Sequence, residues 1–120
     1  MKNNNIENGM KVYFDGDSEW YASPLNLEET RKWAIKEFGY GEELEFEECD
    51  LDCNGAWIVT EDEEHIKALG DYDEKCLGGI GDLRKSRMEH DKVDRLTSFR
   101  DILKRDGYSK QPYEIASTNY

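Results

Sequence analysis

Acidic side chains are concentrated in one stretch of the chain, which limits where a hydrophobic core can form. Residues 42–64 include eleven Asp and Glu and neither Lys nor Arg. Ionised carboxylates are costly to bury, so this stretch must lie largely on the surface. Residues 1–80 hold 21 acids and 7 bases (net −14), and residues 81–120 hold 7 and 9 (net +2), which sum to −12. The concentrated negative field either keeps the chain in solution or steers a basic partner.

Aromatic residues supply the apolar surface that such a chain needs to fold. The 120 residues are 37% hydrophobic and 37% charged, against about 45–50% and about 25% in average globular domains. High charge favours disorder, but three Trp, seven Tyr and four Phe each bury a large area. We therefore expect a flexible leader at 1–9 and a single domain with a thin core at 10–120.

The apolar runs and the cysteines bear on the compartment. No run of 18 or more apolar residues is present, so no membrane span is expected. The N-terminus lacks the apolar segment of a secretion signal. Cys49, Cys53 and Cys76 are odd in number and do not complete a disulfide framework. These features together predict a soluble, cytoplasmic protein with reduced thiols.

The first forty residues carry patterns of two strands and a helix. Apolar and polar residues alternate at 10–14 and predict a half-buried strand, and residues 20–23 return as a second strand after a turn. Asn26 with Glu29 is typical of a helix N-terminus, and Gly39 ends this helix. Its apolar face comprises Leu27, Ala34, Ile35 and Phe38.

The acidic stretch itself has the pattern of a β-hairpin. Residues 43–47 alternate again and predict a strand with one acidic face. Asn54-Gly55 is a strong hairpin signal, so this strand should pair with the apolar residues 56–60. The capping box of Thr60 and Glu63 predicts the start of a helix that ends at Gly70. A loop at 71–81 and a polar helix at 83–93 should follow. The spacing of Leu96, Phe99, Ile102 and Leu103 predicts an amphipathic helix ending at Gly107, and residues 112–116 should form an edge strand. The fold class is α+β, with one small, mainly antiparallel sheet and about three to four helices.

A calcium loop is an alternative interpretation of the centre of this stretch. Asp50-Leu51-Asp52-Cys53-Asn54-Gly55 followed by Glu61 matches the EF-hand pattern. The resemblance to the EF-hand family covers these twelve residues only, since no helix pattern precedes them and Trp57-Ile58 replaces small polar residues. The ligands it implies are Asp50, Asp52, Asn54, the Ala56 carbonyl and Glu61.

No other pattern indicates a cofactor or a catalytic centre. Zinc would need Cys49, Cys53 and Cys76 with His65 or His90, and the cysteine spacing misses the usual knuckle. The chain shows no nucleophile beside a base, and the glycines at 78–81 lack the Lys-Ser/Thr of a phosphate loop. We therefore expect a protein that is not an enzyme and has no cofactor.

Direct nucleic-acid binding is disfavoured by the net charge of −12. The basic segment 84–105 also contains acids, so we interpret it as a mixed-charge helix pair. Its alternative role is to pair with the acidic half, within one molecule or in a dimer.

The acidic strand is the candidate partner-binding site. Alternate residues of a strand lie about 6.8 Å apart on one face, so Glu43, Glu45 and Glu47 would form a row of carboxylates that imitates a nucleic-acid backbone. A basic groove built for phosphates would accept such a row. The full candidate set is Glu42, Glu43, Glu45, Glu47, Glu48, Asp50, Asp52, Glu61, Asp62, Glu63 and Glu64.

Four segments together carry a family resemblance: Met10-Lys11-Val12-Tyr13, Glu19-Trp20-Tyr21-Ala22, residues 42–64, and the tail Pro112-Tyr113-Glu114-Ile115-Ala116-Ser117-Thr118. On these the chain resembles small acidic phage-encoded inhibitors of bacterial defence, of the anti-CRISPR and antirestriction type. The resemblance implies a non-catalytic protein in the host bacterial cytoplasm that blocks the nucleic-acid channel of a CRISPR effector or restriction enzyme. A calcium module and a phage regulatory protein of unknown partner are the alternatives.

Overall fold

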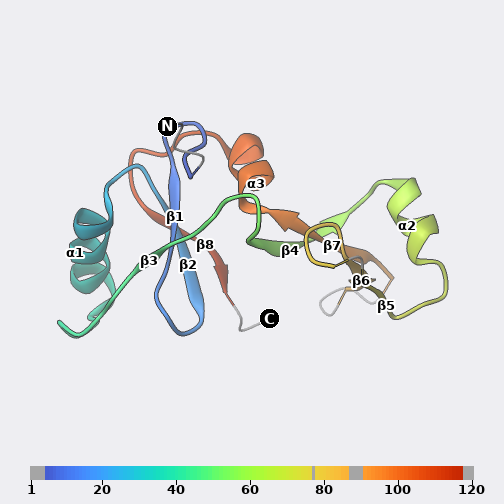
Figure 1. The fold of residues 1–120 in the computed structure, drawn as a ribbon, viewed down its shortest axis with the longest axis horizontal. Helices are drawn as coiled ribbons and strands as arrows, with labels where there is room; N and C mark the ends of the chain where they lie inside the picture. The colour runs from blue at the N-terminus through green and yellow to red at the C-terminus, as the bar shows by residue number, and fades with distance from the viewer. Residues whose placement is uncertain (1–4, 77, 87–90, 118–120) are drawn as a thin grey trace.

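Two antiparallel sheets of four strands each, with three helices, make up the fold of the computed structural model. The structure describes residues 5–76, 78–86 and 91–117 (Figure 1), and all counts refer to these. The α+β class and the number of helices agree with the sequence prediction. The prediction of a single sheet is wrong, because the acidic hairpin does not form and its two predicted halves join different sheets.

The first sheet has the strand order β3-β1-β2-β8. The predicted turn between β1 and β2 is present, since the Asp15 carboxylate accepts hydrogen bonds from the backbone N–H groups of residues 17, 18 and 19. The last strand lies at the edge, as expected, and pairs with β2. The strands are β1 (Lys11–Phe14), β2 (Glu19–Ser23), β3 (Glu47–Glu48) and β8 (Tyr113–Ser117).

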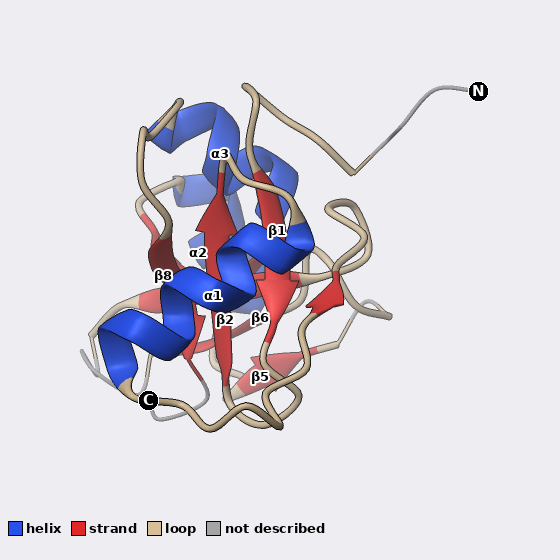
Figure 2. Ribbon diagram, turned by 90° about the vertical axis from the view of Figure 1, so that its left-hand side faces the viewer, coloured by secondary structure: helices blue, strands red, loops and turns tan. Residues whose placement is uncertain are grey.

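Helix α1 (Leu27–Phe38) covers one face of this sheet (Figure 2). It begins where predicted, because Asn26 Oδ1 accepts a hydrogen bond from the Glu29 N–H at 2.8 Å. It ends at Gly39, which has the left-handed φ of 72° that glycine adopts without a steric cost. The prediction of its apolar face is wrong for Phe38, the last residue of the helix, because the Phe38 side chain is 56% exposed.

The second sheet has the order β4-β7-β6-β5. The polar helix predicted at 83–93 is instead strand β6 and the start of β7, while residues 87–90 lie outside the described residues. Arg84 and Asp94 lie opposite each other on these strands and form an ion pair at 3.2 Å. The charges in this segment therefore pair across strands, which is why they show only a weak helical periodicity. The predicted loop contains a two-residue strand. The strands are β4 (Gly55–Thr60), β5 (Glu74–Lys75), β6 (Leu83–Lys85) and β7 (Val93–Ser98).

Helices α2 (Glu63–Leu69) and α3 (Phe99–Asp106) begin later in the sequence than the patterns predicted. The α2 cap is Asp62 rather than Thr60, because the Thr60 hydroxyl lies 2.9 Å from His65 Nδ1. Helix α3 is capped by Ser98, so Leu96 belongs to β7 rather than to the helix. Both helices end at the predicted glycines.

The main core joins the two sheets. On β1, Val12 enters a cluster with Leu51 and Phe99, whereas its neighbour Tyr13 enters a second cluster beneath α1. Strand β1 is therefore buried on both faces, although its alternating pattern predicted one exposed face. Within the described residues, no helix has the length and apolar character needed to cross a membrane.

Residues 5–9 of the predicted leader contact the domain. Asn8 Nδ2 donates to the carbonyl of Leu103 in α3 at 3.1 Å, and Arg100 donates to the carbonyl of Ile6. Residues 1–4 lie outside the described residues, so the boundary between leader and domain stays a prediction.

Candidate partner-binding site

The Asn54-Gly55 pair starts a strand rather than closing a hairpin. The Asp50 carboxylate accepts hydrogen bonds from the N–H groups of Asp52 and Cys53, and the Asp50 carbonyl accepts one from the Asn54 N–H. This closed turn sends the chain away from the first sheet. Gly55 then pairs with β7, so residues 47–48 and 55–60 lie in separate sheets.

The acidic stretch is consequently divided in space. Residues 42–47 lie beside α1 and β3, whereas residues 61–64 form the start of α2 at the opposite end of the molecule (Figure 1), which is 46 Å long. We call residues 42, 43, 45 and 47 the first acidic group and residues 61–64 the second acidic group. The structure therefore does not bring the eleven predicted residues together.

Three acids between these groups bind other parts of the chain. Glu48 accepts a hydrogen bond from Lys11 Nζ at 2.9 Å. Partial burial opposes its ionised form, but the hydrogen bonds from Lys11 and Asn5 outweigh this and lower its pKa. Asp52 forms an ion pair with Arg100 at 2.6 Å, and hydrogen bonding from Arg100 lowers the pKa of Asp52. Together with Asp50, which caps its own turn, these residues hold the fold.

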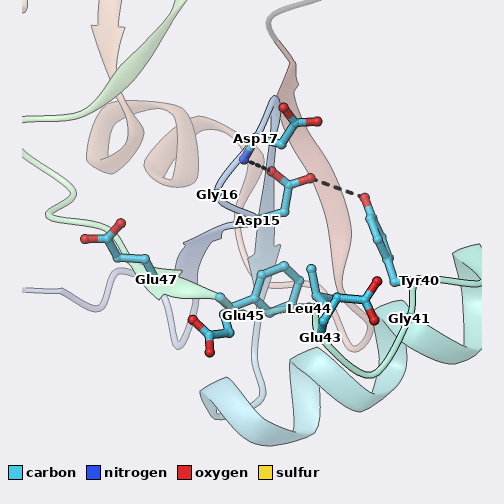
Figure 3. A pocket seen from close by; sticks show the side chains of 10 residues that line it. Asp15, Gly16, Asp17, Tyr40, Gly41, Glu43, Leu44, Glu45 and Glu47 are labelled. Carbon is cyan, nitrogen blue, oxygen red and sulfur yellow. Dashed lines mark hydrogen bonds between the residues drawn. The ribbon is translucent and has the colours of Figure 1, made fainter.

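Three members of the first acidic group, Glu43, Glu45 and Glu47, line a cavity of about 580 Å³ between the β1–β2 turn and the segment 40–47, shown in Figure 3. We call it the acidic groove. Its walls hold five carboxylates, its base includes two apolar side chains, and no Lys or Arg lines it. The lining residues are Asp15, Gly16, Asp17, Tyr40, Gly41, Glu43, Leu44, Glu45, Phe46 and Glu47.

Burial alternates along the groove as the sequence predicted, although only residues 47–48 form a strand. Leu44 and Phe46 are each 7% exposed and pack in the cluster under α1, while the glutamates between them face outward. Arg31 of α1 replaces the missing strand partner, since its guanidinium donates to the backbone carbonyls of Leu44 and Glu42. The row of glutamates is thus fixed by apolar anchors and by one arginine.

Aromatic side chains form one end of the acidic groove. The Tyr40 hydroxyl donates to Asp15 at 3.3 Å and to Glu19 at 3.1 Å. Partial burial raises the pKa of Tyr40, and the nearby Glu19 and Asp15 raise it further. The exposed Phe38 ring lies 6.2 Å from the Tyr40 ring. Tyr40 therefore places a half-buried aromatic ring among the anionic groups of the groove, and the exposed Phe38 lies beside Tyr40 but outside the groove lining.

Sequence analysis missed Asp15, Asp17 and Tyr40 as members of the site. Asp15-Gly16-Asp17 was interpreted only as a turn, which it is. Pairing of Phe14 with Glu47 places this turn above the acidic segment, and no local pattern signals that long-range pairing.

The predicted calcium ligands do not converge. Strand β4 runs extended for six residues between Asn54 and Glu61, which separates them by about 20 Å at the usual rise per residue. Asp50 and Asp52 direct oxygens at protein donors. Cys49 is buried while Cys53 and Cys76 are exposed, and His90 is outside the described residues. Across residues 5–76, 78–86 and 91–117, no three His, Cys, Asp or Glu are grouped as a metal site.

The carboxylates of the acidic groove do not converge on one point. They are spread along a wall, and Figure 3 shows the Glu45 and Glu47 side chains directed away from Asp15. No protein-family model matches the chain, and comparison with curated proteins and with solved structures gives no match either.

Proposed function

We propose that this protein is a non-catalytic acidic inhibitor that binds the basic, nucleic-acid-binding surface of a bacterial defence nuclease, with the acidic groove as the contact. The observation that carries the proposal is the groove itself. Five carboxylates surround a cavity with no basic residue in its lining, and Glu43, Glu45 and Glu47 form no ion pair within the described part of the chain.

Basic side chains of a partner fit this arrangement chemically. Arginine guanidinium groups bind carboxylates and also stack on aromatic rings, and the groove offers both through Glu43 and Tyr40. The overall charge of −12 attracts a cationic surface over a longer range, which raises the association rate and makes it salt-sensitive. The contact is narrower than the eleven-residue row expected from the sequence, because the second acidic group lies too far away.

Charge reversal in the groove tests the proposal. The triple variant Glu43→Lys, Glu45→Lys, Glu47→Lys changes three exposed side chains and shifts the net charge from −12 to −6. The matched control is Glu37→Lys, Asp71→Lys, Asp91→Lys, which makes the same change in net charge at exposed acids outside both acidic groups. Inhibition of DNA cleavage is measured on purified CRISPR effectors and restriction enzymes at low and high salt.

We expect the groove variant to lose inhibition by about 100-fold or more, since several desolvated charge pairs become repulsive. The control should lose less than about 10-fold, through weaker long-range attraction alone. Equal losses in the two variants would show that only net charge matters and would contradict the groove as the site. If the wild-type protein inhibits none of the enzymes, the inhibitor proposal is wrong.

A further inference from the structure

The four edges of the two sheets are protected very differently. Strands β3 and β5 are two residues long and wholly charged, namely Glu47-Glu48 and Glu74-Lys75. Edge strand β8 carries Glu114 and follows Pro112. Short length, charge and proline are the usual means of preventing a sheet edge from pairing with another chain. Edge strand β4 (Gly55–Thr60) has none of them, because its sequence GAWIVT contains neither a charge nor a proline.

Alternate backbone groups of β4 point to its open edge. The Leu96 N–H and C=O bond to Asp82 and Gly81 on the β6 side, so Leu96 and its partner Trp57 do not bond to each other. By alternation, residues 56, 58 and 60 bond to β7, and the N–H and C=O groups of Gly55, Trp57 and Val59 face outward. Among the described strands only β7 pairs with β4.

The strand is held rigidly with this edge in place. On one face, Ala56 and Ile58 pack against the main core. On the other, the Arg84 guanidinium lies 4.1 Å from the centre of the Trp57 ring and pairs with the buried Asp94. An ordered strand loses little conformational entropy when a further strand is added.

The charge around β4 selects the kind of strand that fits. The second acidic group follows Thr60 directly, and Glu61, Glu63 and Glu64 are exposed without an ion pair to any described residue. Consider two copies of the chain that pair antiparallel through β4, centred on Trp57. The second acidic group of each copy would then lie beside Asp50 and Asp52 of the other copy. Like charges placed opposite each other destabilise such pairing, whereas lysines or arginines flanking an extended segment would be attracted.

We infer that the open edge of β4 is a docking site for an extended, basic segment of a partner protein, which adds a fifth strand to the second sheet. Main-chain hydrogen bonds from Gly55, Trp57 and Val59 supply the affinity, as in other cases of strand addition, and the second acidic group supplies the preference for basic flanks. The inference goes beyond the proposed function and does not rest on it, because the basic character of the partner follows from the second acidic group.

Amide hydrogen exchange of the full chain, followed by NMR, tests this inference. The probe is a synthetic peptide of about ten residues in which Val and Thr alternate between a pair of Lys at each end. In the free protein, the Trp57 and Val59 amides should exchange fast and those of Ala56, Ile58 and Thr60 slowly. The peptide should slow exchange at Trp57 and Val59 by about 10-fold or more once it forms hydrogen bonds to them.

Two variants provide a matched comparison. Val59→Pro removes one outward N–H without touching the ladder to β7 and should abolish peptide binding. Val59→Thr keeps the N–H and the branched shape, and should retain binding. If the proline variant does not fold, the exchange rates of the wild-type protein still decide the outcome.

Three results would overturn the inference. The first is unchanged exchange at Trp57 and Val59 with the Lys-flanked peptide. The second is equal slowing of exchange by a peptide flanked by Glu, which would contradict the preference for a basic partner segment. The third is protection in the free protein that grows with protein concentration, which would identify a second copy as the occupant. Neither the groove nor a nuclease enters this assay, so its failure is distinguishable from failure of the proposed function.

Discussion

The two sheets of this protein contain equal numbers of strands but are stabilised unequally. The first sheet is buried on both faces, with Val12 in the main core and Tyr13 and Tyr21 beneath α1. Among the described residues, the outer part of the second sheet rests on a cluster of three buried side chains, Leu69, Leu83 and Val93. The difference indicates that apolar burial is greater around the first sheet, and that the second sheet depends on its attachment through β4 to the main core.

Ion pairing compensates only in part for the small core of the second sheet. The Arg84–Asp94 pair is largely buried and is covered by Trp57. A buried ion pair costs desolvation and adds little net stability, although removing one partner is strongly destabilising. We therefore expect the outer strands of the second sheet to open before the first sheet does.

Core truncation gives the largest test of this difference. Phe99 is fully buried between the sheets, so Phe99→Ala should lower the free energy of unfolding by about 3–5 kcal/mol. Leu69→Ala in the three-residue cluster should cost about 2 kcal/mol, at the low end for leucine, because a cluster near the surface collapses more easily. Urea unfolding followed by tryptophan fluorescence measures both. Equal costs would show that the two regions are equally well packed.

Replacement of Gly55 tests how tightly β4 is attached. A Cβ on Gly55 would lie 2.0 Å from the backbone carbonyl oxygen of Thr97 in β7, so Gly55→Ala must push the two strands apart. We expect a loss of about 1–3 kcal/mol, the usual cost of overpacking. The control is Gly41→Ala in the acidic groove, where the three atoms nearest the added Cβ all belong to the flexible end of the Glu43 side chain and the change should stay within about 0.5 kcal/mol. A Gly55 variant as stable as the control would contradict the close approach of β4 and β7.

Glu114 on β8 gives the smallest effect and tests repulsion at the edge of the first sheet. Burial, followed by the negative charges of Glu19 and Asp15, raises the pKa of Glu114. Because the folded-state pKa lies above the unfolded value, the protonated form favours folding, and the ionised form weakens the fold at neutral pH. Glu114→Gln should therefore raise the melting temperature slightly at pH 7. The gain should vanish below the ordinary glutamate pKa, where the wild-type side chain is neutral in both states.

Melting curves at pH 7 and at about pH 4 measure this change, since glutamate is largely protonated only near or below its ordinary pKa. A gain of the same size at both values would show that ionisation of Glu114 is not its cause.

Local chemistry explains which elements the sequence predicted. Asn26 and Gly39 set the ends of α1 through bonds and backbone angles within a few residues, and Asp15 closes the β1–β2 turn in the same way. The strand pairings that the sequence predicted wrongly depend on contacts between distant residues. Asn54-Gly55 has a strong hairpin preference, but the Asp50 turn and pairing with β7 outweigh it.

The sequence predicted the row of glutamates in the candidate site, but it did not predict the residues that form the opposite side of the groove. Period-two alternation of Leu44 and Phe46 with glutamates follows directly from burial of the apolar side chains. The opposite wall, Asp15 and Asp17, reaches the groove only through the β1–β3 pairing. The separation of residues 61–64 from the groove likewise follows from sheet topology, which charge and periodicity do not encode.

The pairing of β2 with β8 has a consequence for biosynthesis. Glu19 in β2 lies opposite Ser117 in β8, so the first sheet is completed only after almost a hundred further residues have followed β2 out of the ribosome. Until then, the emerging chain presents β2 as a bare edge, while β1, β2 and α1 can already associate. Completion of this sheet therefore waits for β8 to emerge, and chaperones that hold nascent chains would encounter β2 before its natural neighbour does.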